Sequence, residues 1–156
     1  MSSTEFQPST IDTRDLLPAP INPDWVLAGQ PRARAVDLAH SPDGTCTSAQ
    51  WDCTAGRFFW YFGVEETVHI LEGEVVVTNH AGQAVRLQPG DVAVMPANTW
   101  MVWDVENYVR KLAVCRYAIP RPFGRALRMF QTWRNRFMLR GGRTPQLAQA
   151  PAPAVR

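Results

Sequence analysis

The sequence predicts an all-β antiparallel barrel, preceded by an extended N-terminal arm and followed by a C-terminal amphipathic helix. Three observations support this: a proline-rich start, short β-type segments with closely spaced turn residues, and a helical apolar period near the end. At 156 residues the chain is long enough for one domain with a buried core. We expect the arm at 1–33, the barrel at 34–120, the helix at 121–141 and a disordered tail at 142–156.

Proline dominates the first segment. Because proline lacks a backbone N–H and fixes φ, we expect an extended arm there and not a helix. The prolines are Pro8, Pro18, Pro20, Pro23 and Pro31. Apolar side chains at Ile21, Trp25, Val26 and Leu27 would anchor the arm along the barrel or across a dimer partner.

The central segment has β-type composition in short pieces. The expected strands are Arg34–Ala39, Ser48–Cys53, Arg57–Phe62, Thr67–Leu71, Glu74–Asn79, Ala84–Leu87, Asp91–Met95, Met101–Val105 and Val109–Ile119. Gly, Asn and Pro between them supply the φ values that tight corners require. Closing such a sheet into a barrel removes exposed edges that would otherwise pair with other chains.

After Pro122 the apolar residues recur at helical spacing. They are Ala126, Met129, Phe130, Trp133 and Phe137. Gly141 and Gly142 follow, as expected at the end of a helix. The helix is strongly basic: residues 121–156 hold eight arginines and no acid, whereas residues 1–120 hold all 14 acidic residues and eight basic ones. The helix therefore fits packing on the acidic barrel or across a dimer; contact with an anionic membrane surface is a weaker alternative. No motif for specific nucleic-acid recognition accompanies the charge.

The chain carries no signal for export or membrane insertion. It lacks an apolar run long enough to span a bilayer, and its start has neither a basic nor an apolar signal region. Cys46, Cys53 and Cys115 form no CxxC pattern. We therefore expect a cytoplasmic protein with three free thiols.

Two residue spacings in the central segment are typical of a known protein family. Gly56 opens an aromatic run, Glu66 is separated from Gly73 by six residues, and Gly90 is separated from Pro96 by five. These spacings resemble the two motifs of the cupin superfamily, G-x5-H-x-H-x3-4-E-x6-G and G-x5-P-x-G-x2-H. The resemblance implies a jelly-roll barrel and, for a cupin of this size, a homodimer.

Further landmarks are similar to the ureidoglycine aminohydrolase-like subgroup of small single-domain cupins. They are residues 21–29, 51–58, 66–73, 89–91, 103–105 and 109–111. The resemblance implies action on a small ureido, amino or carboxylate compound through a bound metal. A shared fold does not by itself fix a reaction.

The metal-ligand positions of the motifs are largely replaced. The two histidines of the first motif correspond to Phe59 and Tyr61, or in the other register to Trp60 and Phe62. In the second motif Asn98 stands at the glycine and Met101 at the histidine. Glu66 alone remains of four expected ligands, and divalent metals need several imidazoles or carboxylates. We therefore expect no metal ligand set and no cofactor, and the sequence disfavours a divalent metal.

The three histidines do not restore the ligand set. His69 lies three residues after Glu66, and odd spacing on a strand places two side chains on opposite faces. If Glu66 faces the barrel interior, His69 faces away. His80 falls in an expected hairpin turn, and His40 precedes the expected turn at residues 41–44.

The barrel interior is the expected site. Glu66 and Tyr61 are the candidate catalytic pair, since a carboxylate among aromatic walls suits proton transfer. The candidate ligand-binding residues are Phe59, Glu66, Trp100, Met101 and Trp103. In the alternative, the aromatic residues fill the barrel and Glu66 only bonds buried backbone or pairs with Arg57 or Lys111.

The sequence favours a cupin-fold protein that binds a small molecule without the usual histidine-ligated metal. Two alternatives stay open: an enzyme of the ureidoglycine aminohydrolase-like branch, and an oligomeric accessory or scaffold protein. The expected partners are the small-molecule ligand and a second copy of the chain.

Overall fold

The computed structural model describes residue 8, residues 13–117 and residues 121–141. It forms two units, Met1–Ala118 and Ile119–Arg156, each of which is described by itself. The expected disordered tail at 142–156 lies outside the described residues.

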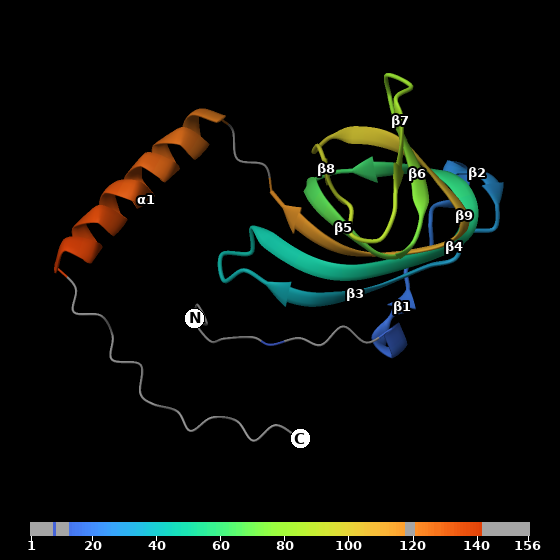
Figure 1. Ribbon diagram of the computed structural model, residues 1–156, viewed down its shortest axis with the longest axis horizontal. Helices are drawn as coiled ribbons and strands as arrows, with labels where there is room; N and C mark the ends of the chain where they lie inside the picture. The colour runs from blue at the N-terminus through green and yellow to red at the C-terminus, as the bar shows by residue number, and fades with distance from the viewer. Residues whose placement is uncertain (1–7, 9–12, 118–120, 142–156) are drawn as a thin grey trace. The chain divides into compact units, whose positions relative to one another are not determined.

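The first unit is a strongly curled antiparallel sheet (Figure 1), which confirms the all-β prediction. Its nine strands are β1 (Leu17–Pro18), β2 (Val26–Gly29), β3 (Ala33–His40), β4 (Cys46–Phe62), β5 (Glu65–Gly73), β6 (Val75–Asn79), β7 (Ala84–Leu87), β8 (Val92–Met95) and β9 (Thr99–Arg116). The main path through the sheet runs β1-β3-β4-β9-β5-β8.

Two long strands join the two walls of the half-barrel. β4 and β9 pair from Cys46↔Arg116 to Phe62↔Thr99. The first part of β4 and the last part of β9 carry β3 and β5 at their outer edges, and β8 follows β5. The last part of β4 pairs with β2, the first part of β9 pairs with β6, and β7 pairs with the other edge of β6. Side chains on the inner face of both walls therefore meet in one interior.

The long strands correct a prediction, because Ser48–Cys53 and Arg57–Phe62 were expected as separate strands. The chain does not turn at Gly56 but shifts register between Thr54 and Gly56. A Cβ at Gly56 would lie 2.7 Å from the Pro31 ring. Glycine here thus permits a bulge and the close approach of the arm. Met101–Val105 and Val109–Arg116 likewise belong to one strand, β9, and residues 118 and 119 of the expected strand lie outside the described residues.

Two of the motif positions, Gly73 and Asn98, have a left-handed backbone conformation. Gly73 has a φ of 67°, and a Cβ there would meet the carbonyl oxygen of Tyr108 at 1.9 Å. Asn98, which replaces the motif glycine, has a φ of 59°, a conformation that asparagine tolerates better than most residues. The spacing of the motifs therefore reflects the geometry of the turns, and this geometry is kept although the histidines are replaced.

The described part of the arm lies along its own sheet. β1 pairs with β3 and β2 pairs with β4, and two short 3-10 helices, Thr13–Asp15 and Pro23–Trp25, interrupt the extended backbone. The Trp25 ring meets Trp60 and Trp100 edge-on, with centroids 6.3 and 5.0 Å apart. The arm is therefore less uniformly extended than the prolines predicted.

The second unit contains α1 (Arg121–Gly141), which confirms the expected helix. Phe130 and Trp133 lie on one face with ring centroids 6.3 Å apart, as the apolar period predicted. In the part of the chain that the structure describes, no helix is both long enough and apolar enough to cross a membrane.

Candidate functional site

A buried ion pair lies inside the half-barrel. Along β5 the buried side chains alternate, so Glu66, Val68 and Ile70 share the inner face. Lys111 of β9 lies on the same face, in register with Ile70 and Trp51. Its Nζ donates to Glu66 Oε1 at 2.5 Å, and the two residues are only 3% and 8% exposed. The expected alternative of a Glu66–Lys111 pair is thus realised.

Aromatic rings surround the ammonium group of Lys111. Its Nζ lies 4.6 Å from the ring centroid of Trp103, 5.0 Å from that of Trp51 and 5.9 Å from that of Phe62. The negative faces of such rings attract a cation, most strongly where water is excluded. The carboxylate and the rings together compensate the lost hydration of the ammonium.

Two hydrogen-bond donors near this pair have no acceptor among the described residues. The indole Nε1 atoms of Trp51 and Trp103 are buried and bond to no described residue. The two rings lie 5.7 Å apart in an edge-to-face arrangement. Buried donors usually have partners, so two unpaired ones in one interior require an explanation.

A cavity of about 150 Å³ opens among β6, β7, β8 and β9, and neither Trp51 nor Trp103 is among the residues that line it. Its apolar lining comes from β6, β7, β8 and β9: Val77, Val85, Leu87, Ala93, Met95 and Met101. Asn79 and Gln83 add amide groups. Val77 pairs with Trp103 and Met95 pairs with Glu66, so the residues that line the cavity are direct neighbours of the ion pair and its aromatic surroundings.

The structure brings three of the expected site residues to the inner face. Glu66 and Trp103 are buried there, and Met101 packs against the core and lines the cavity. The expected facing of His69 away from Glu66 is confirmed by the alternating burial of β5. His40 bonds Thr47 at the exposed end of β3, away from the inner face.

Phe59, Tyr61 and Trp100 lie elsewhere, which corrects their expected place in the interior. They are 39%, 38% and 44% exposed, and alternate with the inward residues of their strands. The Tyr61 hydroxyl donates to Asn98 Oδ1, and its ring lies 5.0 Å from that of Trp100. The second register of the motif, with Trp60 and Phe62 facing inward, is the one that the fold adopts. Glu66 therefore has Lys111 as its partner, and not Tyr61.

The residues present do not fit the metal that the cupin motifs imply. Within residues 13–117 and the described helix, no group of three or more His, Cys, Asp or Glu side chains is placed to hold an ion. The inward positions of the first motif carry the aromatic rings of Trp60 and Phe62, which are not metal ligands, and Glu66 is bonded to Lys111. An ammonium group thus supplies the positive charge next to this carboxylate.

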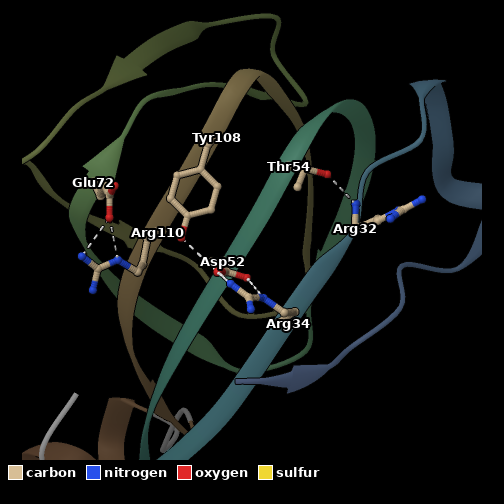
Figure 2. Close-up of polar contacts among 7 residues, drawn as sticks. All are labelled: Arg32, Arg34, Asp52, Thr54, Glu72, Tyr108 and Arg110. Carbon is tan, nitrogen blue, oxygen red and sulfur yellow. Dashed lines mark hydrogen bonds and ion pairs between the residues drawn. The ribbon is translucent and has the colours of Figure 1, made fainter. Parts of the chain in front are cut away.

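A second buried carboxylate lies on the outer face of the sheet (Figure 2). Asp52 of β4 accepts from Arg34 Nε at 3.1 Å, from Arg34 Nη2 at 2.5 Å and from the Tyr108 hydroxyl at 2.9 Å. Arg34 and Tyr108 reach it from the two flanking strands, β3 and β9. Burial and the bond to Asp52 raise the pKa of Tyr108 to about 12. Around this network, Arg110 donates to Glu72, and Thr54 Oγ1 accepts from the backbone N–H of Arg32.

Sequence reasoning did not identify Asp52, Gln50 or Trp51 as residues of interest. Trp51 is inward, whereas Gln50 and Asp52 lie on the outer face, where the amide of Gln50 is buried without a partner among the described residues. Lys111 was considered only as a partner of Glu66. Its signal was the alternation Val109-x-Lys111-x-Ala113, which puts a cation in register with two core residues.

The thiols with resolved shifts are poor nucleophiles at neutral pH. Burial raises the pKa of Cys53 to about 12 and that of Cys115 to about 11, the latter aided by nearby Glu66. Cys115 lies opposite Glu66 in the β5–β9 register. Both thiols remain protonated near pH 7, so they act there as apolar groups.

Comparisons with known proteins agree with the observed fold. Residues 40–113 match the model of the EutQ-like cupin domain. A protein of unknown function from Pseudomonas syringae pv. tomato has a TM-score of 0.59 and 24% identity over 64% of this chain, which spans only 43% of that protein. No curated protein is significantly similar in sequence.

Two further solved structures show the same fold. A putative ethanolamine utilization protein Q from Salmonella typhimurium has a TM-score of 0.56 and 21% identity, covering 70% of this chain and 86% of its own. A predicted oxalate decarboxylase from Thermotoga maritima has a TM-score of 0.53 and 17% identity, covering 70% and 99%. The curled antiparallel sheet is therefore a cupin-type fold, and residues 40–113 are similar to the EutQ-like cupin domain.

Proposed function

We propose that this cupin binds a small molecule inside its barrel without a histidine-ligated metal. The observation that carries the proposal is the apolar cavity of about 150 Å³, one of whose lining residues, Met95, is the strand partner of the buried Glu66. Small-molecule sites are concave, mostly apolar and supplied with a few placed polar groups. The interior has this make-up, and its carboxylate already has a cation as partner.

Ligand chemistry resembling the ureidoglycine aminohydrolase-like branch is a weaker proposal for this chain. That branch depends on a metal, and the donor set around Glu66 does not fit one. The proposal is therefore binding, and it assigns no reaction.

Metal analysis and a ligand screen test the proposal together. Elemental analysis of the purified protein should find no divalent metal at stoichiometric level. A thermal-shift screen of small metabolites should find a compound that raises the melting temperature, because a ligand that binds only the folded state stabilises it. A stoichiometric divalent ion would contradict the metal-free site.

Substitutions at two neighbouring positions on β8 test whether the ligand lies in the cavity. Ala93→Leu adds volume to a residue that lines the cavity and should abolish the ligand's thermal shift. Val92→Leu is the matched control, since Val92 is on the outer face and mostly exposed. An equal ligand response in both variants would place the ligand outside the barrel.

A further inference from the structure

We propose that a groove between the N-terminal arm and β3 binds a small organic acid, a single carboxylate that carries an apolar group. The groove has a volume of about 350 Å³. It shares no described lining residue with the cavity inside the barrel, so it is a second site and does not depend on the proposed function. Its apolar walls include Pro18, Pro20, Ile21 and Pro31, and its charged residues are Arg32 and Arg34.

The register of β1 and β3 places the two arginines and two of the prolines on one face. Pro18 and Arg34 are direct cross-strand partners, and a backbone hydrogen bond of 2.9 Å joins the next residues of the two segments. Because side chains alternate along an extended chain, Pro20 and Arg32 follow on the same face. The two arginines are therefore roughly 7 Å apart along the strand, opposite the proline rings.

The walls of the groove are fixed by the fold. The backbone N–H of Arg32 donates to Thr54 Oγ1 at 2.9 Å, and its carbonyl oxygen accepts from the N–H of Thr54 at 3.1 Å. The Pro31 ring packs so closely on Gly56 that a Cβ at Gly56 would lie 2.7 Å from it. Proline also fixes φ on the side of the arm. A ligand would therefore lose little affinity to ordering this part of the chain.

The two arginines differ in how far their charges are compensated. Arg34 donates to both carboxylate oxygens of Asp52, and its side chain is 45% exposed. Arg32 is exposed, and no hydrogen bond or ion pair joins its guanidinium to a side chain in the described part of the chain. Figure 2 shows Arg32 extending away from Asp52. Two cations and one anion leave one positive charge uncompensated, which matches a monoanion.

A carboxylate with an apolar group fits both halves of the groove. A guanidinium binds a carboxylate through two parallel N–H bonds, and all the N–H groups of Arg32 are available for this. A phosphate dianion would bring two negative charges to one uncompensated positive charge. The hydrocarbon part would lie on the proline rings and beside Ile21. An apolar lining with a few placed polar groups, at this volume, is usual for small-molecule sites.

A panel of small molecules tests the ligand class. The full-length protein is titrated by calorimetry, up to millimolar concentration, with cyclohexanecarboxylate, cyclohexanecarboxamide, cyclohexylmethylammonium, acetate and inorganic phosphate. Cyclohexanecarboxylate should bind most tightly, by about tenfold or more over its neutral amide, because hydrogen bonds to a charged group are lost in the amide. Acetate should bind more weakly because it lacks the hydrocarbon part. Equal or tighter binding of the amide, the cation or phosphate, or no binding of cyclohexanecarboxylate, would overturn the proposal.

Removing the uncompensated charge tests the role of Arg32. Arg32→Gln should weaken cyclohexanecarboxylate binding by about tenfold or more and leave binding of the amide almost unchanged. Arg86→Gln is the matched control, because Arg86 is an exposed arginine of β7 outside the groove. An equal affinity for cyclohexanecarboxylate in both variants would remove Arg32 from the site.

A pair of substitutions on the arm tests the site from its other side. Pro20→Glu places a carboxylate across from Arg32 and should abolish binding of cyclohexanecarboxylate. Pro20→Gln has the same length without the charge and removes the same ring, so it should retain clearly more of the affinity. Because Pro20 is exposed, both variants should fold. An equal loss in both would contradict a site that recognises the anion through Arg32.

The barrel variant separates this site from the cavity of the proposed function. Ala93→Leu, which fills the barrel cavity, should leave the affinity for cyclohexanecarboxylate unchanged. If Ala93→Leu abolishes this binding and Arg32→Gln does not, the acid binds in the barrel, and the groove is not its site. A failure of the groove therefore leaves the proposed function standing.

Discussion

Two buried carboxylates occupy opposite faces of the same sheet and differ in how completely their surroundings are satisfied. Asp52 on the outer face accepts three hydrogen bonds, two of them from one guanidinium. Glu66 on the inner face has one ammonium partner, and two indole donors nearby have none among the described residues. A fully bonded buried charge indicates a structural role, whereas the inner face leaves two buried donors without an acceptor among the described residues.

The two partners also differ in their access to water. The Arg34 side chain is about half exposed, so its charge keeps part of its hydration. Lys111 is almost fully buried and depends on Glu66 and on the aromatic rings. Breaking the inner pair should therefore lower the free energy of unfolding more than weakening the outer network does. Four measurements compare the two regions.

The largest effect is expected from Lys111→Met. The substitution keeps an unbranched chain but leaves Glu66 buried without a cation, which should lower the free energy of unfolding by about 3–5 kcal/mol. Urea denaturation checks this. The double variant Glu66→Leu with Lys111→Met should regain most of the loss. Arg116→Met, which breaks the exposed neighbouring pair with Glu65, is the control and should cost less than about 1 kcal/mol. A loss equal to that of the control would show that the inner pair contributes no more than a surface one.

Asp52→Asn should have an intermediate effect. It replaces one accepting oxygen by an amide donor that faces Arg34 or Tyr108, and it should lower the free energy of unfolding by about 1–3 kcal/mol. The same denaturation experiment measures it, and Asp104→Asn, in an exposed and looser pair with Arg57, is the control. If Asp52→Asn destabilises the fold more than Lys111→Met, the ranking of the two regions is reversed.

Gln50→Met should stabilise the protein. The amide of Gln50 is fully buried on the outer face and has no partner in the described part of the chain, so an apolar side chain of similar length removes a desolvation cost of about 1–3 kcal/mol. A higher urea midpoint checks the gain. A lower midpoint would mean that the amide is bonded in solution, for example to a buried water.

The most gradual effect concerns alkaline pH. The pKa values of Cys53, Tyr108 and Cys115 are raised in the folded state, from 9.0 to about 12, from 10.0 to about 12 and from 9.0 to about 11. Between the unfolded and folded values the unfolded chain binds fewer protons, so stability is full below pH 9 and falls as the pH rises toward 12. Unfolding midpoints from pH 8 to 11 measure the slope, and Cys53→Ala should make it shallower. A midpoint independent of pH would contradict the raised values.

Much of the fold could be predicted from the sequence. The turn residues and the motif spacings gave the antiparallel sheet, and the strand Ala84–Leu87 agrees to the residue. Strand alternation placed His69 and Glu66 on opposite faces correctly. These features depend on local backbone preferences and on the alternation of side chains along a strand, and both can be read from neighbouring residues.

The site could be predicted only in part. Glu66, Met101 and Trp103 were placed correctly in the interior, but Tyr61 and Phe59 were assigned by the wrong one of two registers of the motif. The run from Phe58 to Phe62 is aromatic at every position, so its composition does not distinguish the inner face from the outer.

The sequence by itself thus determined the curled sheet, the helix and the loss of the histidines, because turns, periods and residue types are local. Only the tertiary structure decided what fills the interior, because pairing between β5 and β9 brings Lys111 to Glu66 across 45 residues of chain. The same curvature gathers Trp51 and Trp103 around that ammonium, where their indole donors are buried without an acceptor among the described residues. Whether a buried charge is compensated and a buried donor is hydrogen-bonded depends on all the groups around it in space. Strand pairing brings those groups together from distant parts of the chain.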